Sequence, residues 1–467
     1  MGKGGQGLWR TPGLKEGRTQ KLDSPIKRTG PMSLARQLAE RITALHYEAL
    51  PPEAVYWSKV AVLDTIGVAL AGSIEAAPRI VEEVLGLQAN GGPSLVFGTN
   101  RRVACLEAAL VNGTAAHALD FDNTSNYVFG HESAAIIPAL IAVSEVCGAS
   151  GRDLLLAYVA GFETATRIGA AVTYYHSEKG WHTTSTTGVF GVAAACARLL
   201  GLSVTETETA LALSTSLAAG IKACFGTMTN PLHAGQCSRG GLMAALLARK
   251  GFTANPHAFE HKHGFFNVFN GPGTYDAARA VESWGDPLSI VTPGASYKQY
   301  PCCYSTHAVV DAALTLVRQH GPFDVHALAR VDLWSPVPRL THTDRPNPNN
   351  AHDAIFSVQY CVARALLEGD VVLEHFEGDA HLDPVVRGLL PRIHAAPYTG
   401  KSCSADDLFD AEVKITLADG RTYTANVDYW MRDWVFRPDL RKRGNSKILK
   451  RKRRGRKAGK RFIRTRI

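Results

Sequence analysis

Four segments of the chain carry side chains of the types that bind anions and transfer protons. The first holds Asp120, Thr124 and His131, with His131 just before a predicted helix. The second, residues 179–188, places His182 ahead of several hydroxyl side chains at the start of another predicted helix. Backbone amides at a helix N-terminus favour negative charge, so a histidine there suits a carboxylate or phosphate ligand. An ordinary loop histidine and a Thr-rich helix cap remain the structural alternatives.

The third and fourth segments add further polar groups. Residues 226–235 link two predicted helices and include Asn230, and residues 297–307 include Lys298 and Cys303. The fourth segment lies at a predicted domain boundary, where ligand clefts are common. Lys298 could neutralise a substrate carboxylate there, whereas a surface lysine is the alternative. Together the four segments indicate an anion site with imidazoles that can act as general acid and base.

Other familiar chemistries are disfavoured by the sequence. A Walker loop, an H-E-x-x-H motif and a G-x-S-x-G motif are absent, and the one G-x-G-x-x-G string, residues 2–7, follows no strand pattern and so is no Rossmann fingerprint. His261, His263 and His342 have no carboxylates at metal-site spacing, and none of the nine cysteines forms a C-x-x-C pair. We therefore predict no metal. Scattered cysteines in Ala-rich stretches are typical of buried thiols in a reducing compartment, which predicts a cytoplasmic protein.

The elements that must position these segments are mostly helices. Apolar residues recur at helical spacing over 54–71, 103–120, 134–147, 152–171, 187–200, 205–219 and 235–250. Gly148 and Gly201 follow two of these patterns as stop signals, and Ser203 with Glu206 forms a capping-box start. These patterns predict one large all-helical domain over residues 32–293, without alternating strand–helix units.

The pattern changes near residue 293. Residues 331–335 alternate as a strand does, and residues 356–367 resemble a helix that ends at Gly369. Asp419-Gly420 between 412–417 and 421–427 is a strong hairpin signal. We therefore predict a mainly α protein in which a smaller α+β lid domain, residues 294–428, follows the helical domain.

Charge is distributed unevenly along the chain. The net charge of +9 arises from the ends, because residues 437–467 hold 16 bases and one acid, and residues 1–31 hold seven bases and two acids. We interpret residues 1–31 as a disordered or artefactual basic extension and residues 429–467 as an atypical, disordered basic tail. No run of 18 apolar residues occurs, which predicts no membrane helix. Nucleic-acid binding is expected only non-specifically, through the tail.

The four segments, in this order, resemble the MmgE/PrpD family, whose members include 2-methylcitrate dehydratase and cis-aconitate decarboxylase. The strings that carry the resemblance are 112–122 (NGTAAHALDFD), Gly130-His131, 230–235 (NPLHAG), Tyr300-Pro-Cys302 and 356–360 (FSVQY). The resemblance as a whole covers about residues 33–429. The resemblance implies a helical domain with an α+β lid, an active site between them, a homodimer, and no required metal or cofactor.

Carried over residue by residue, the resemblance implies a pocket that contains Asp120, Thr124, His131, His182, Lys298 and Tyr360. We expect His131, His182 and Tyr360 to be the catalytic residues and Asp120, Thr124, Lys298, Asn230 and Cys303 to contact substrate. Asn230 stands where the decarboxylase pattern has a lysine, and Cys303 where it has a histidine. These two differences favour dehydration over decarboxylation.

The predicted function is a cofactor-independent hydro-lyase, similar to 2-methylcitrate dehydratase, that acts on a small hydroxy-polycarboxylate through histidine-mediated proton transfer. A racemase or epimerase and a carboxy-lyase are alternatives in the same pocket, since all three reactions share a carbanion-like intermediate beside a carboxylate. From a different class, the basic tail could make the chain a nucleic-acid-binding protein.

Overall fold

The computed structural model describes residues 32–86, 91–125, 127–128, 130–397 and 410–427. All described residues except Met32 belong to one unit within residues 33–467. The predictions for the basic segments 1–31 and 429–467, including nucleic-acid binding by the tail, lie outside the described residues.

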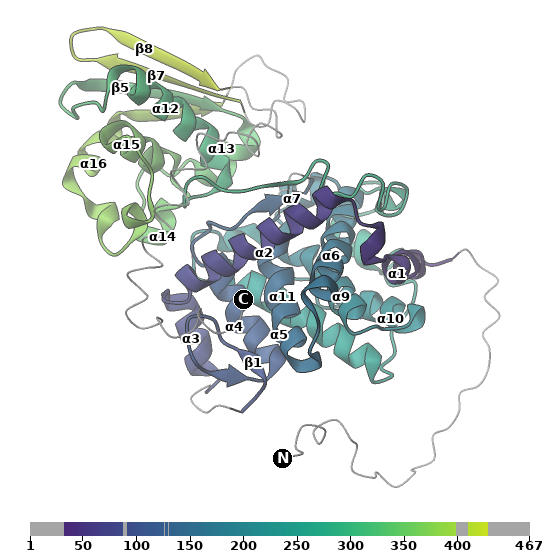
Figure 1. Cartoon of the computed structure of the whole chain (residues 1–467). Coiled ribbons are helices and arrows are strands. Elements are labelled where there is room, and N and C mark those ends of the chain that lie inside the picture. The colour runs from purple at the N-terminus through teal and green to yellow at the C-terminus, as the bar shows by residue number, and fades with distance from the viewer. Residues whose placement is uncertain (1–31, 87–90, 126, 129, 398–409, 428–467) are drawn as a thin grey trace, which may run out of the picture. The chain divides into compact units, whose positions relative to one another are not determined.

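The first 250 residues of this unit are mainly helical (Figure 1). Their helices are α1 (Leu34–Ala44), α2 (Pro52–Gly72), α3 (Ala76–Val84), α4 (Cys105–His117), α5 (Glu132–Cys147), α6 (Gly151–Val172), α7 (Tyr175–Glu178), α8 (Thr183–Thr186), α9 (Gly188–Leu199), α10 (Val204–Ser214) and α11 (Thr229–Arg249). The prediction that this region contains helices alone is wrong, because short strands also occur in it. These pair β1 (Ser94–Leu95) with β2 (Arg102–Val103), and β3 (Thr124–Ser125) with β4 (Ala295–Ser296).

Small residues let the central helices approach closely. Gly113 in α4 faces Gly235 in α11, and a Cβ built on Gly113 would lie 2.9 Å from the Gly235 Cα. Side chains larger than hydrogen at these positions would force the two helices apart. The close crossing matters for the site, because α4 ends at His117 and α11 begins beside Asn230.

The remaining described residues combine helices with a four-stranded sheet (Figure 1). The helices are α12 (His307–His320), α13 (Val337–Thr343), α14 (Ala351–Ala354), α15 (Val358–Glu368) and α16 (Pro384–Leu389), and the strands are β5 (Leu328–Ser335), β6 (Ile393–Pro397), β7 (Ala411–Leu417) and β8 (Thr422–Val427). The strand order is β6-β5-β7-β8, with β5 and β6 parallel and the other pairs antiparallel. The predicted hairpin is confirmed, with Gly420 at φ 87° in its turn.

Apolar side chains gather into two main cores. The first runs from Leu34 to Ala295 and the second from Tyr300 to Ala425. The protein is therefore mainly α, as predicted. The exact domain boundaries and the lid role of the second region stay predictions.

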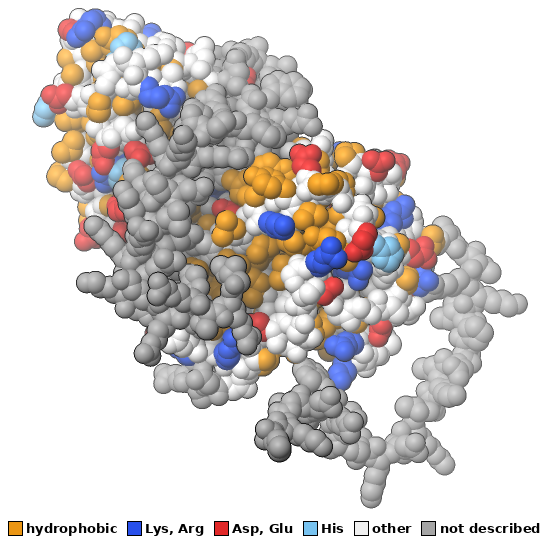
Figure 2. Space-filling view, in the orientation of Figure 1, with side chains coloured by type: hydrophobic (Ala, Val, Ile, Leu, Met, Phe, Trp, Pro, Cys, Tyr) orange, Lys and Arg blue, Asp and Glu red, His pale blue; other side chains and the backbone are white. Residues whose placement is uncertain are grey.

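Among the described residues, α2 is the one helix of 18 or more residues that is apolar enough to cross a membrane. In its most apolar stretch of 18 residues, 44% of the residues are buried inside the protein. Core helices share this length and composition, so the feature alone does not indicate a membrane span. Tyr56, Leu63 and Leu70 are exposed on α2, and Figure 2 shows hydrophobic side chains gathered on this part of the surface.

Candidate active site

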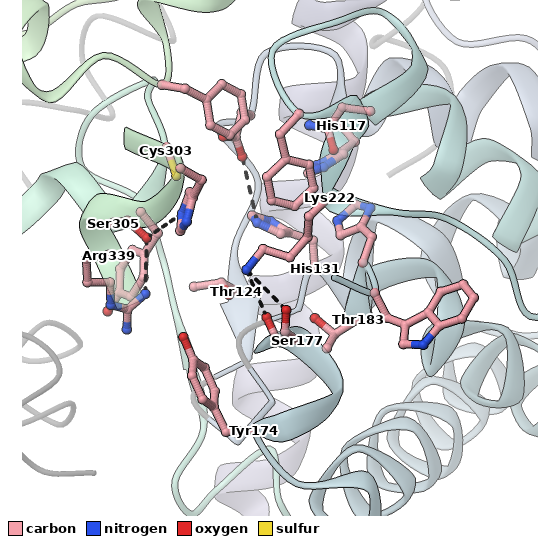
Figure 3. Close-up of a pocket in the computed structure, with 18 residues that line it drawn as sticks. His117, Thr124, His131, Tyr174, Ser177, Thr183, Lys222, Cys303, Ser305 and Arg339 are labelled. Atoms are coloured by element: carbon pink, nitrogen blue, oxygen red, sulfur yellow. Dashed lines mark hydrogen bonds and ion pairs between the residues drawn. The ribbon is translucent and has the colours of Figure 1, made fainter. Parts of the chain in front are cut away.

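One pocket of about 660 Å³, including its open mouth, collects most of the predicted residues (Figure 3). Helix α4, the loop before α5, the start of α8 and the start of α11 supply one part of its lining. The 3₁₀ turn Tyr304–Thr306, helix α13 and Phe356 supply another. The lining residues are His117, Asp120, Thr124, His131, Tyr174, Ser177, Trp181, His182, Thr183, Lys222, Phe225, Asn230, Cys303, Tyr304, Ser305, Arg339, His342 and Phe356.

Asp120 is held in an unusual backbone conformation by Lys298. Its φ of 45° lies in the left-handed region, which few residues other than glycine adopt. The Lys298 ammonium donates to the Asp120 carbonyl at 2.6 Å and also bonds its carboxylate. Pairing of Thr124 with Ser296 brings the segment that carries Lys298 across to Asp120. Lys298 therefore clamps both the backbone and the side chain of Asp120.

Asp122 joins two imidazoles. Its Oδ1 lies 3.0 Å from His117 Nδ1, and its Oδ2 lies 2.9 Å from His131 Nδ1. The two rings lie 4.6 Å apart between centroids. One buried carboxylate thus orients two histidines that face the pocket.

His182 completes the imidazole cluster. Its ring centroid lies 5.8 Å from that of His117, and its Nδ1 lies 3.1 Å from His233 Nδ1. Phe225 meets the His182 ring edge-on at 4.9 Å. Apolar and imidazole neighbours therefore surround His182, and the described neighbours offer little to stabilise a positive charge on it.

The surroundings give the imidazoles different charges. Burial lowers the pKa of His182, and the neighbouring histidines lower it well below its usual value. Burial also lowers the pKa of His131, with Lys298 opposing the influence of Asp122. Burial acts on His117 in the same direction, but Asp122 outweighs it and the pKa of His117 is raised. The cluster thus combines two imidazoles whose pKa is lowered with one whose pKa is raised, which is the arrangement of an acid beside bases.

A second wall of the pocket carries cations. Lys222 donates to the carbonyl and hydroxyl oxygens of Ser177 at 3.3 and 3.4 Å. Arg339 donates to the Ser305 hydroxyl at 3.3 Å, and that hydroxyl also lies 3.0 Å from His342 Nε2. These groups add positive charge to a pocket whose lining carboxylate, Asp120, is already paired with Lys298.

The structure brings together most, but not all, of the predicted residues. Six of them line the pocket: Asp120, Thr124, His131, His182, Asn230 and Cys303. Lys298 lies behind this lining, fully buried, with its ammonium bonded to Asp120.

Tyr360 is placed elsewhere. It is buried in the second core and is not among the lining residues of this pocket. Its hydroxyl donates to the His375 carbonyl at 2.5 Å and accepts from Arg364 at 3.0 Å. These bonds indicate a packing role for Tyr360, because they occupy the proton that the expected catalytic role would use.

Several residues of the site are not among those that the sequence singled out. His117 and Asp122 lie inside the string 112–122, and their spacing across the end of a helix was the available signal. Lys222 lies far in sequence from Arg339 and His342 on α13 and meets them only in the fold, so no local pattern joins the three.

His117, Asp120, Asp122 and His131 also form a group that could hold a metal ion, since their ligand atoms lie within 4.8 Å of one another. The Lys298 ammonium is bonded to one of these carboxylates and already supplies a cation there. We therefore assign no metal to this group, and the prediction of no metal stays a prediction.

The chain is similar to known proteins over most of its length. A family model described as the MmgE/PrpD N-terminal domain matches residues 36–278, and one described as the MmgE/PrpD C-terminal domain matches residues 300–448. The chain is 30% identical over 412 residues to the human protein named cis-aconitate decarboxylase, which covers 86% of this chain and 84% of that protein. The mouse protein of that name is 31% identical over 430 residues, with 88% and 85% covered. An Aspergillus terreus protein of the same name is 26% identical over 409 residues, with 81% of each chain covered.

Proposed function

The chain belongs to the MmgE/PrpD family and is a lyase, and from this premise we propose that it dehydrates a small hydroxy-polycarboxylate in the pocket described above. The observation that carries the proposal is the cluster of three imidazoles with unlike proton affinities at a cation-lined cavity. Elimination of water needs this combination, because a base must take a proton and an acid must deliver one.

The proposed steps use only side chains of this chain. A neutral imidazole, His131 or His182, takes the proton from the carbon beside a carboxylate. The electron pair forms the double bond as the C–O bond of the neighbouring carbon breaks. His117 gives its proton to the departing hydroxyl, so water leaves. Asp122 stabilises the charged form of His117, and the cationic wall stabilises negative charge that develops on the substrate carboxylate.

We further propose that the residues around the second core act as the lid of this site. Cys303, Ser305 and Arg339 belong to that region and line the pocket together with residues of the helical part. Exclusion of water by such a cover would strengthen each electrostatic contact inside.

Decarboxylation is the second candidate, favoured by the printed names of the relatives. In that reaction the C–C bond to a carboxylate breaks, CO₂ leaves, and the remaining carbanion takes a proton from His117. Asn230 and Cys303 are neutral where the decarboxylase pattern carries a lysine and a histidine. Fewer cations and proton donors would then stabilise the carbanion, which is why dehydration is the first candidate.

A substrate panel tests the proposal. The full chain is supplied with citrate, 2-methylcitrate and cis-aconitate, and the absorbance of unsaturated products and the release of CO₂ are measured separately. We expect ultraviolet absorbance to rise with a hydroxy-polycarboxylate and without CO₂. Release of CO₂ from cis-aconitate would replace dehydration by decarboxylation. Exchange of deuterium from D₂O without loss of water would favour the epimerase alternative.

Matched variants locate the activity in this pocket. His131→Asn should lose most turnover, whereas His257→Asn should keep it, because His257 is exposed and pairs with Glu260 outside the pocket. Equal activity of the two variants would remove the pocket from the mechanism.

We also propose that the chain forms a homodimer. Helices α2 and α3 expose large hydrophobic side chains, among them Leu63, Ile80 and Val84, and apolar surfaces of this kind mark association sites. Light scattering should give twice the chain mass of 50.3 kDa, and Leu63→Glu should shift the protein to monomer. A monomeric wild type would overturn this proposal.

A cytoplasmic location remains part of the proposal. All eight cysteines among the described residues are free thiols, as a reducing compartment would keep them.

A further inference from the structure

Helix α11 places a second histidine directly behind His182. His233 lies near the start of α11, and its Nδ1 is 3.1 Å from the Nδ1 of His182. The two ring centroids lie 5.3 Å apart. His182 lines the pocket, whereas His233 is partly exposed and does not belong to the pocket lining. The contact between the two rings therefore lies behind the pocket wall, on the side of His182 that the substrate does not reach.

A glycine in the loop before Lys222 makes room for this contact. The backbone amide of His182 donates to the Gly220 carbonyl at 3.0 Å, so the backbone of His182 is tied to this loop. Gly220 has a φ of 116°, which favours glycine. A Cβ built on it would lie 3.3 Å from the His233 ring and 2.3 Å from the Ser185 Oγ. The absence of a side chain at Gly220 thus lets the two imidazoles meet.

The contact determines which ring nitrogen of His182 is a base. Two neutral imidazoles share one N–H···N bond only if one Nδ1 carries hydrogen and the other Nδ1 does not. If the Nδ1 of His182 donates, its Nε2 has a free lone pair; if the Nδ1 accepts, the Nε2 carries the hydrogen and cannot take a proton. Among the described residues, the Nε2 of His182 has no hydrogen-bond or ion-pair partner. That nitrogen can therefore meet a ligand.

The charged and titratable groups around this pair keep both rings neutral. Burial is the main cause that lowers the pKa of His182, and three neighbouring histidines lower it further, against the opposite effect of Asp122. These neighbours are His117, His233 and His131. Burial and the charge of His117 lower the pKa of His233 to about 4. Both rings are thus neutral at pH 7, which is the condition for an N–H···N bond between them.

His131 is placed differently from His182. Its Nδ1 lies 2.9 Å from the Oδ2 of Asp122, and its Nε2 lies 3.7 Å from the Oδ1 of Asp120. Both ring nitrogens of His131 therefore face carboxylates. Of the two imidazoles with lowered pKa, His182 is the one that has a nitrogen without such a neighbour.

We infer that His233 is a positioning residue that accepts a hydrogen bond from the Nδ1 of His182, so that the Nε2 of His182 is the base that removes the carbon-bound proton. This inference rests on the proposed lyase function and extends it, because it chooses between His131 and His182. The proton passes from the substrate carbon to this Nε2, and the C–H electron pair forms the double bond. The C–O bond breaks as His117 protonates the hydroxyl, and water leaves. The bond to His233 meanwhile stabilises the doubly protonated His182.

Three replacements of His233 separate positioning from packing. His233→Asn keeps a neutral acceptor close to the position of Nδ1, His233→Asp supplies an acceptor with negative charge, and His233→Leu removes the acceptor. The kinetics of the full chain are measured with citrate and 2-methylcitrate as a function of pH. The matched control is His257→Leu, because His257 is an exposed histidine whose Nδ1 bonds Glu260 at 2.8 Å outside the pocket.

We expect His233→Leu to lower kcat by about 10-fold with little change in KM, the loss expected for one hydrogen bond between neutral groups. His233→Asn should recover most of that loss. His233→Asp should move the acid limb of kcat/KM to higher pH, because a carboxylate stabilises the protonated form of His182. A residue that only fills space would not move this limb. His257→Leu should match wild type, and should His233→Leu fail to fold, the other two variants decide the outcome.

The tautomer is measured apart from turnover. Nitrogen-15 NMR of the full chain labelled at histidine distinguishes a ring nitrogen that carries hydrogen from one that does not, and the signals lost in His182→Asn belong to His182. We expect hydrogen on the Nδ1 of His182 and none on its Nε2 in wild type, with a mixture of the two forms in His233→Leu.

The results separate this inference from the lyase reaction. Hydrogen on the Nε2 of His182 in wild type would overturn the positioning role, even if the chain dehydrates a polycarboxylate. So would a kcat and an acid limb that are the same in wild type and in all folded His233 variants. The expected tautomer, in a chain that turns over no member of the panel, would support the role of His233 and overturn the proposed reaction.

Discussion

Replacement of Lys298 by methionine tests how the site is held together. The Lys298 side chain is fully buried, and its ammonium bonds both the carboxylate and the carbonyl oxygen of Asp120. Methionine keeps most of the side-chain length but leaves the buried Asp120 carboxylate without its cation. A second buried carboxylate, that of Asp122, lies nearby. Removal of one partner from a buried ion pair costs about 3–5 kcal/mol. That is a large part of the roughly 5–15 kcal/mol that stabilises a typical protein.

The assay is urea unfolding of the full chain at pH 7 for wild type, Lys298→Met, Asp120→Asn and the double variant. The double variant should be more stable than Lys298→Met, because it has no unpaired carboxylate. Lys298, His131 and His117 outweigh burial and lower the pKa of Asp120 in the folded state. The stability from this shift is present above the unfolded pKa and is lost as pH falls through the folded pKa. As pH falls, Lys298→Met should therefore lose less of its free energy of unfolding than wild type does.

Lys262→Met is the control, because Lys262 is exposed. Its free energy of unfolding should stay within about 0.5 kcal/mol of wild type. If Lys298→Met cost less than about 1 kcal/mol and mainly raised KM, Lys298 would be a direct ligand of the substrate, and the reasoning about the Asp120 clamp would be refuted.

Three further predictions follow from single side chains. His182→Ala should lower kcat by about 100- to 10,000-fold while circular dichroism stays unchanged; wild-type turnover would remove His182 from the mechanism. Gly235→Ala should cost about 1–3 kcal/mol in urea unfolding, because its Cβ would press on Thr114 and the α4 backbone. Gly151→Ala, with open space around it, should be neutral, and equal losses would contradict the helix-crossing argument. Burial raises the pKa of Glu132 to about 8, so folding costs stability as pH rises from the unfolded pKa of this carboxyl group toward 8. Glu132→Gln should therefore raise the free energy of unfolding by about 4 kcal/mol at pH 8 and change it little at pH 4. An equal effect at both pH values would contradict this.

Local signals in the sequence predicted much of the fold. Ser203 and Glu206 form the expected capping box at α10, and α5 ends at Cys147 with Gly148, at φ 67°, as its C-cap. Such features depend on a few consecutive residues, which is why they can be read from sequence. Helix α11 starts at Thr229 rather than at the predicted Gly235, because Pro231 lies in the first helical turn, where proline is tolerated.

The candidate site was predictable only in part. His131 and His182 each precede a helix, so the sequence marks them as possible anion contacts. Lys298 was expected to face substrate, yet the fold places its ammonium on Asp120. Arg339 gave no signal because the surface that it shares with Lys222 exists only after residues far apart in sequence have packed together. Long-range packing of this kind leaves no local pattern.

The dependence of kcat/KM on pH, compared for wild type and Asp122→Asn, tests the central claim most directly. Wild type should give a bell-shaped profile, with activity falling at high pH as His117 loses its proton and at low pH as the neutral imidazoles gain one. Asp122 holds the pKa of His117 up, so Asp122→Asn should move the alkaline limb to lower pH. An alkaline limb that stays in place in a folded Asp122→Asn variant would contradict the assignment of His117 as the acid of an imidazole-driven elimination.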